Sequence, residues 1–213
     1  MTGLLDLLFP PRCLLCGELL DGEKFLCGSC RKSAPWCHKV KTKSQFLDSI
    51  TAVWYYKENV RSSLLRFKFG SQPQLAAGYG RFLGAQIRRT CPGPFDYLTW
   101  VPTASRRKFH RGYDQAELLC RAVGKELHMK PVRLLKKVRN NPAQSGLSDP
   151  AARRANVMGV YRPAGSRMLA GKRILLIDDI LTTGATAGEC ARVLRAQGAS
   201  QVHCGAVAVS DRS

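Results

Sequence analysis

The segment Arg173–Thr186 constrains this chain more than any other stretch of its sequence. An aliphatic run, Ile174–Ile177, is followed by two adjacent carboxylates, Asp178 and Asp179, and then by a short loop with three threonines and a glycine. A run of this kind is typical of a central parallel strand that is covered on both faces. A helix is expected directly after the loop. Because ligands of open α/β sheets bind beyond the carboxyl ends of the strands, the segment predicts a ligand site.

The sequence from about Phe46 onward alternates between strand and helix patterns. Strands are predicted at four further places, namely Ile50–Tyr56, Tyr97–Val101, Val132–Leu135 and Val202–Val209. Helices are predicted at Asn59–Phe67, at Gln74–Ile87, after Asp114, which can cap a helix with Glu117 three residues on, and after the threonine loop, ending near Gly198. This alternation predicts an α/β fold with a central parallel sheet flanked by helices.

The threonine loop has the chemistry of a phosphate site. Backbone N–H groups at the start of a helix suit a phosphate, and Gly184 lets the backbone come close to it. Two carboxylates beside such a site would repel a bare anion, so they fit a ligand that also offers hydroxyl groups and a divalent metal. The competing interpretation is a structural turn, because Asp and Thr are also good helix caps. The loop residues concerned are Thr182, Thr183, Gly184, Ala185 and Thr186.

Two polar stretches are expected near the same edge of the sheet. The first follows the strand Tyr97–Val101 and contains Thr103, Ala104, Ser105, Arg106, Arg107 and Lys108. It is either a loop that binds pyrophosphate or a solvated cationic turn. The second, with Arg139, Gln144 and Arg153, is long and poor in apolar residues. It is either a lid over the site or a plain connector.

The cysteines divide the chain. There are nine, an odd number, and no secretory signal precedes them, which favours reduced thiols over a disulfide framework. Cys13, Cys16, Cys27 and Cys30 form two C-x-x-C pairs, the pattern of a tetrahedral structural Zn²⁺ site. Metal would supply this small segment with folding free energy on the order of 10 kcal/mol. Cys37 and His38 are either a further ligand pair or surface residues, and the absence of another cysteine pair favours the second.

The net charge and the hydropathy of the chain limit the classes of partner that it can have. The formal net charge is +19, and most of it lies beyond residue 45. Such an imbalance favours polyanionic partners such as nucleic acid or phosphate-rich substrates, unless it is chance basicity. The longest apolar runs are far shorter than the roughly 20 residues of a membrane-spanning helix. Since no targeting segment is evident, we expect a cytoplasmic protein.

The strand, the two acids and the sequence T-T-G-x-T resemble the signature of type I phosphoribosyltransferases. Arg111-Gly112-Tyr113-Asp114-Gln115, Phe67-Lys68-Phe69-Gly70 and the cysteine cluster narrow the match, and the chain resembles the ComF family of competence-associated proteins along nearly its whole length. The family's usual R-G-F-N-Q reads R-G-Y-D-Q here, so Asp114 adds a negative charge near the basic loop. The resemblance implies a type I phosphoribosyltransferase fold over residues 46–213 and a zinc-ribbon-like module over residues 1–45.

The resemblance also implies roles for the site residues. Asp178 and Asp179 would hold the ribose 2′- and 3′-hydroxyls of 5-phosphoribosyl 1-pyrophosphate, directly or near Mg²⁺. Thr182–Thr186 would cradle the 5′-phosphate, and Thr103–Lys108 would be the pyrophosphate loop. The expected activity is that of a pentosyltransferase, which moves a phosphoribosyl group to a nitrogen acceptor. The sequence identifies neither a catalytic base nor the acceptor.

The second functional hypothesis is a competence factor that binds single-stranded DNA during uptake for natural transformation, with the ligand pocket in a regulatory role. The ComF resemblance implies this role, and the positive charge fits binding to a phosphate backbone. Aromatic side chains either stack on bases or belong to the core, the candidates being Trp54, Tyr55, Tyr56, Phe109 and Tyr113. The sequence leaves the oligomeric state open.

Overall fold

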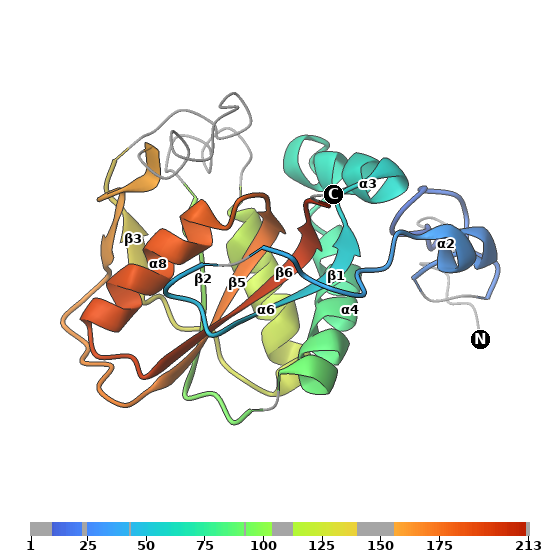
Figure 1. Ribbon diagram of the computed structural model, residues 1–213. Helices are drawn as coiled ribbons and strands as arrows, with labels where there is room; N and C mark the ends of the chain where they lie inside the picture. The colour runs from blue at the N-terminus through green and yellow to red at the C-terminus, as the bar shows by residue number, and fades with distance from the viewer. Residues whose placement is uncertain are drawn as a thin grey trace.

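The computed structural model of the chain describes residues 10–22, 25–42, 44–91, 93–103, 113–139 and 156–211. Its centre is a four-stranded parallel sheet in the order β1-β6-β5-β2 (Figure 1). The strands are β1 (Ser49–Tyr55), β2 (Tyr97–Trp100), β5 (Arg173–Leu181) and β6 (Gln201–Val209). A separate antiparallel pair consists of β3 (Leu135–Lys137) and β4 (Tyr161–Pro163).

Helices cover both faces of the sheet (Figure 1). The helices that the structure describes are α2 (Gly28–Ser33), α3 (Glu58–Phe69), α4 (Leu75–Thr90), α6 (Gln115–Leu127) and α8 (Ala185–Ala196). Of these, α4 and α6 lie on one face of the sheet and α8 on the other. Successive residues of β5 point to opposite faces, so Leu175 and Ile177 join the core with α4 and α6, while Ile174 and Leu176 join the core under α8. This arrangement confirms the predicted fold class.

Strand β5 is longer than the sequence suggested. We expected it to end at the acid pair, but it continues to Leu181 and includes both acids. The reason is its neighbour β6, which keeps pairing with it from Asp178 opposite Ala206 to Leu181 opposite Val209. On the other side, β2 ends at Trp100, opposite Ile177. The acids therefore lie where β5 extends past the end of β2.

The strand predicted at Val132–Leu135 is displaced in a similar way. Pro131 forms a single parallel bridge with Leu98, and the Val132 amide donates to the Leu98 carbonyl at 2.8 Å. Regular pairing begins only at Leu135, where β4 becomes the partner. The other predicted strands and helices lie within a few residues of the observed ones.

The cysteine-rich segment shares its core with the rest of the protein. Leu14, Leu15 and Leu26 are buried in the same apolar cluster as residues of α3 and α4. Trp54 is fully buried there and packs on Trp36, with ring centroids 5.4 Å apart, so it is a core residue and not a platform for bases. Among the residues described, no helix is both long and apolar enough to span a bilayer.

Candidate ligand site and zinc centre

The two acids of β5 are in different environments. Asp178 is buried, and its Oδ1 accepts a hydrogen bond from the Asp179 amide at 2.8 Å. Burial, and then the negative charge of Asp179, raise the pKa of Asp178 to about 8. The side chain of Asp179 is 15% exposed, and its Oδ2 lies 2.8 Å from Nζ of Lys68. Burial thus raises the pKa of one carboxyl, while the other is paired with Lys68 and only partly buried.

The threonine loop follows the acids as predicted. Residues 182–184 form bends between β5 and α8, and the helix begins at Ala185. Gly184 precedes the helix with φ of +73°, a conformation that a residue with a Cβ rarely adopts. Oγ1 of Thr183 accepts the Ala185 amide at 3.2 Å. The N–H groups of the first helical turn have no partner within the helix, so this end of α8 suits an anion.

The loop after β2 begins beside the acids. The Val101 amide donates to the Ile177 carbonyl at 2.9 Å, which brings residue 101 alongside the start of the acid pair. The amide and the hydroxyl of Thr103 both donate to Asp114, at 3.0 and 3.1 Å. In this structure, therefore, both Thr103 donors are occupied by Asp114. The remaining candidates of this loop, Ala104–Lys108, lie outside the described residues.

Asp114 explains how the loop is held. It is the N-cap of α6, and its Oδ1 accepts the amides of Ala116 and Glu117 at 3.1 and 3.2 Å, as the sequence predicted. Burial raises the pKa of its carboxyl. The negative charge that departs from the family's pattern thus serves to fasten the loop after β2 to α6.

The two ends of the candidate lid lie side by side. Nη2 of Arg139 donates to the Met158 carbonyl at 2.7 Å, and the Val138 amide donates to the Val160 carbonyl at 2.9 Å. The Gly159 amide donates to Oε1 of Glu189 on α8 at 2.9 Å. A cavity of about 480 Å³ lies between this junction and the threonine loop, lined by Ser44–Phe46, Val157–Met158, Thr183–Ala185, Gly188–Glu189 and Arg192. Gln144 and Arg153 lie outside the described residues.

Lys68 is the site residue to which the sequence analysis gave no role. It is the only described cation placed in an ion pair with the acid pair of β5, and it comes from α3, far away in the sequence. In the sequence, Lys68 lies within the segment Phe67-Lys68-Phe69-Gly70. This segment indicates the family but no chemical role for the lysine. Only the three-dimensional fold brings this helix to the end of β5.

The four predicted zinc ligands form one cluster. The Sγ atoms of Cys13, Cys16, Cys27 and Cys30 all lie within 4.8 Å of one another. Although burial raises the pKa of Cys13, hydrogen bonds from the backbone of Cys16, Cys27 and Leu15 outweigh it and lower the pKa to about 7. Burial and the neighbouring thiols raise the pKa of Cys30. Four thiols this close together fit a site where a bound cation displaces their protons.

Cys37 does not belong to this cluster, and it is not the surface residue that we expected. It is buried in the core under α8, and its amide donates to the Val53 carbonyl at 2.9 Å. Burial raises the pKa of its thiol. His38, in contrast, is exposed, as expected. Within the described ranges, the four-cysteine cluster is the one group with metal-ligand geometry.

Known proteins match both parts of the chain. The double zinc ribbon domain matches residues 4–43, and the phosphoribosyl transferase domain matches residues 114–213. Competence protein F of Haemophilus influenzae is 29% identical over 90% of this chain and 82% of its own length. The DNA utilization protein YhgH of Escherichia coli O157:H7 is 27% identical over 89% of this chain and 86% of its own.

Among solved structures, the glutamine phosphoribosylpyrophosphate amidotransferase of B. subtilis is similar, with a TM-score of 0.44 and 19% identity. The match covers 66% of this chain and 30% of that one. The relatives extend along nearly the whole chain, and both domain matches fall where the cysteine cluster and the acid pair lie. Along nearly its whole length the chain is similar to competence protein F and to the YhgH proteins, and it joins a double zinc ribbon domain to a phosphoribosyl transferase domain.

Proposed function

We propose that the chain binds 5-phosphoribosyl 1-pyrophosphate, or a related phosphorylated ribose, with Mg²⁺ at the end of β5 and transfers the phosphoribosyl group to an acceptor. The observation that carries the proposal is that Asp178 and Asp179 are followed, within six residues, by Gly184 and the start of helix α8. Carboxylates suit ribose hydroxyls, and the start of α8 suits a phosphate. Their order along the chain matches the order of these groups on a ribose 5-phosphate.

Each predicted site residue has a role in this proposal. Asp179, which is charged and accessible, accepts hydrogen bonds from the ribose hydroxyls, and buried Asp178 holds the Asp179 backbone. Thr182–Thr186 bind the 5′-phosphate. The loop after β2 binds the pyrophosphate through Ala104, Ser105, Arg106, Arg107 and Lys108, while Thr103 fastens its base to Asp114. Arg139, Gln144 and Arg153 belong to a lid. The hydrogen bonds of Arg139 and Gly159 support the lid, because they hold its two ends together and against α8.

The donor set is compatible with Mg²⁺. Carboxylate oxygens are the hard ligands that this ion prefers, and Asp179, the less buried member of the acid pair, offers them at the proposed ribose position. When bound, the ion would neutralise part of the charge of the pyrophosphate. Because Lys68 already bonds Oδ2 of Asp179, the ion would share this carboxylate with an ammonium group.

The proposed transfer replaces one bond at C1 of the ribose with another. The bond between C1 of the ribose and the pyrophosphate oxygen breaks, and pyrophosphate departs with the electron pair. A bond from C1 to a nitrogen of the acceptor forms, and that nitrogen loses a proton. Positive charge on the ribose ring peaks between the two events, while the cations of the loop after β2 would offset the charge of the departing group.

A pyrophosphate-release assay tests the transfer. The zinc-loaded protein is incubated with 5-phosphoribosyl 1-pyrophosphate and Mg²⁺ in the presence of nucleobases, amines or single-stranded DNA. Release that depends on one acceptor class and disappears in Asp179→Asn would support the proposal. If no acceptor raises release above the rate with the ligand alone, the protein is not a transferase for these acceptors, and its pocket is a sensor.

The second candidate function is binding of single-stranded DNA, and one surface of the structure favours it. Lys136 and Arg162 lie directly opposite each other across the β3–β4 pair, and both are exposed. Like charges in such a position repel each other and destabilise the pair. In the part of the chain that the structure describes, neither side chain has an acidic partner. A polyanion bound across the pair would relieve this repulsion.

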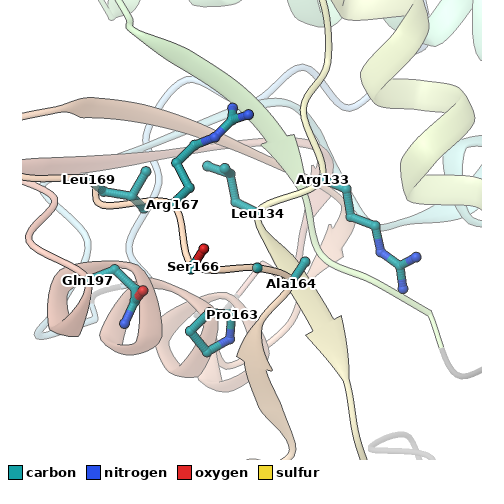
Figure 2. Close-up of a pocket in the computed structure, with 9 residues that line it drawn as sticks. Arg133, Leu134, Pro163, Ala164, Ser166, Arg167, Leu169 and Gln197 are labelled. Atoms are coloured by element: carbon teal, nitrogen blue, oxygen red, sulfur yellow. The ribbon is translucent and has the colours of Figure 1, made fainter.

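A cavity continues the cationic surface. It has a volume of about 450 Å³ and lies between the β3–β4 pair and the end of α8. Figure 2 shows Arg133 and Arg167 at its rim, with Leu134, Pro163 and Leu169 lining it with apolar atoms. The Arg167 guanidinium also lies 5.4 Å from the centroid of the Tyr97 ring. We call Arg133, Lys136, Arg162 and Arg167 the hairpin cationic face.

Fluorescence anisotropy with a labelled single-stranded oligonucleotide tests this candidate. The double variant Lys136→Glu, Arg162→Glu should weaken binding about tenfold or more and flatten its salt dependence, because two phosphate contacts are lost. The double variant Arg61→Glu, Lys125→Glu, which makes the same change in net charge at two exposed cations outside the β3–β4 pair, is the matched control. If affinity does not change with salt, or if both variants bind alike, the hairpin cationic face is not the binding surface.

A further inference from the structure

Helix α3 connects the zinc centre with the ligand site. Near its start, Nδ2 of Asn59 lies 3.5 Å from Sγ of Cys30, a zinc ligand. Near its end, Nζ of Lys68 lies 2.8 Å from Oδ2 of Asp179. The two residues are about 13 Å apart along the helix axis. In Figure 1, α3 lies at the end of the sheet to which β5 and β6 point, on the side toward α2.

The middle of α3 is fixed to the first pair of zinc ligands. The residues between Cys13 and Cys16 are Leu14 and Leu15, and both offer their carbonyl groups to α3. Oγ of Ser63 donates to Leu14, and Nη2 of Arg66 donates to Leu15 at 2.8 Å. Both leucines are buried against the helix. The loop that carries two metal ligands therefore determines where this helix lies.

The end of α3 is fixed from the other side. Phe67 is fully buried, and its ring lies 5.5 Å from that of Tyr79 and 6.0 Å from that of Tyr113. The Tyr113 hydroxyl donates to the Phe67 carbonyl at 2.6 Å. A Cβ at residue 70 would lie 2.8 Å from the Arg66 carbonyl oxygen, so glycine is required where the helix ends. These contacts hold the end of α3 in place and so restrict the position of Lys68.

The ion pair between Lys68 and Asp179 stabilises its partners more than an ordinary surface pair does. The side chains of Lys68 and Asp179 are only 21% and 15% exposed, so solvent screens them less. Asp179 is also adjacent to a second carboxyl group, that of Asp178. Without the ammonium group, keeping Asp179 charged and in place would be costlier, because a partly buried charge would lose its partner.

We propose that Lys68 is a positioning residue of the ligand site, which holds Asp179 for the ribose hydroxyls, and that the zinc centre sets the place of Lys68 through α3. This inference rests on the proposed ribose site for its effect on binding, but not for the connection itself. It gives the geometry of the cysteine cluster a consequence at the other end of α3. Zinc occupancy and ligand affinity should therefore change together.

Titration calorimetry with ribose 5-phosphate on the full, zinc-loaded chain tests the role of Lys68. Lys68→Met should bind about tenfold more weakly than wild type, with zinc content and far-UV circular dichroism unchanged. Lys68→Arg should recover most of the loss. Arg61→Met is the matched control, because it removes an exposed cation from the same helix. Wild-type affinity in Lys68→Met would overturn the positioning role.

The connection to zinc is tested without any ligand. Hydrogen exchange should accelerate in Glu58–Phe69 when a chelator removes the metal, while α8 keeps its protection. Arg66→Met should accelerate the same segment with zinc still bound, because it cuts the contact with the first ligand loop. Unchanged exchange in α3, or equal acceleration throughout the protein, would overturn the connection. If ribose 5-phosphate fails to bind wild type, the proposed function fails, and the exchange result still decides the connection.

Discussion

The carboxylate of Asp114 accepts hydrogen bonds from both the amide and the hydroxyl of Thr103, at 3.0 and 3.1 Å. Oδ2 accepts the hydrogen bond from the Thr103 amide. Oδ1 accepts those from the Thr103 hydroxyl and from the first amides of α6. A single side chain thus starts a helix and anchors the loop that follows β2. An asparagine has one acceptor oxygen only, and its amide group would face the Thr103 N–H.

Asp114→Asn should therefore destabilise the protein. We expect a loss of about 1–3 kcal/mol in the free energy of unfolding, because a buried donor loses its acceptor. Urea denaturation followed by circular dichroism measures it. Glu117→Gln, which changes a surface ion pair with Arg121, should cost less than about 0.5 kcal/mol. Equal effects of the two substitutions would show that Asp114 is not the anchor.

The buried Asp178 predicts how stability varies with pH. Its pKa rises from an ordinary 3.8 to about 8 on folding, so between these values the folded protein holds a proton that the unfolded chain releases. The contribution of Asp178 to the free energy of unfolding therefore falls as the pH rises from about 4 to about 8. Asp178→Asn should flatten this dependence and add about 0.5–2 kcal/mol of stability at pH 8.

Thermal unfolding from pH 5 to pH 8 checks this prediction. The difference in melting temperature between Asp178→Asn and wild type should grow with pH. A constant difference, or a wild type that is more stable at pH 8 than the variant, would show that Asp178 is charged without cost in the folded state.

The cysteine geometry predicts one zinc ion per chain. The matching domain is a double zinc ribbon, but Cys37 is buried in a different core and only one four-cysteine cluster lies within the described residues. Plasma mass spectrometry should find one zinc per protein. Cys37→Ala should keep this value, and Cys30→Ser should lose the metal. Two ions per chain would require ligands outside the described residues.

Asp179→Asn should separate the two proposed functions. It removes the charge that accepts the ribose hydroxyls, so binding of 5-phosphoribosyl 1-pyrophosphate should weaken about tenfold or more. The hairpin cationic face lies elsewhere, so affinity for single-stranded DNA should not change. Calorimetry and anisotropy on the same preparation measure both. Joint loss of the two would indicate one shared site.

Much of the fold could be predicted because its signals are local. The aliphatic run of β5, the Asp114 cap and the spacing of the cysteines each lie within a few residues, and each predicts its structure by periodicity, hydrogen bonding or metal-ligand geometry. The predicted succession of acids, threonine loop and helix could be placed on the sheet edge by the general rule for α/β ligand sites.

The features that sequence reasoning missed depend on distant partners. The extension of β5 through the acids depends on β6, which keeps pairing with it to Val209. Lys68 reaches Asp179 only because the zinc ligand loop and Tyr113 fix α3 at both ends. Cys37 looks like a free residue beyond the cluster, but its own segment, residues 35–37, pairs with β1 and places the side chain in the core under α8. None of these contacts leaves a periodic trace in the sequence.

Isothermal titration of the zinc-loaded protein with 5-phosphoribosyl 1-pyrophosphate and Mg²⁺ tests the ligand site most directly. The account predicts saturable binding of one ligand per chain, competition by ribose 5-phosphate, and a clear loss of affinity in both Asp179→Asn and Lys68→Met. Absence of heat from wild type, or equal affinity in wild type and Asp179→Asn, would contradict it.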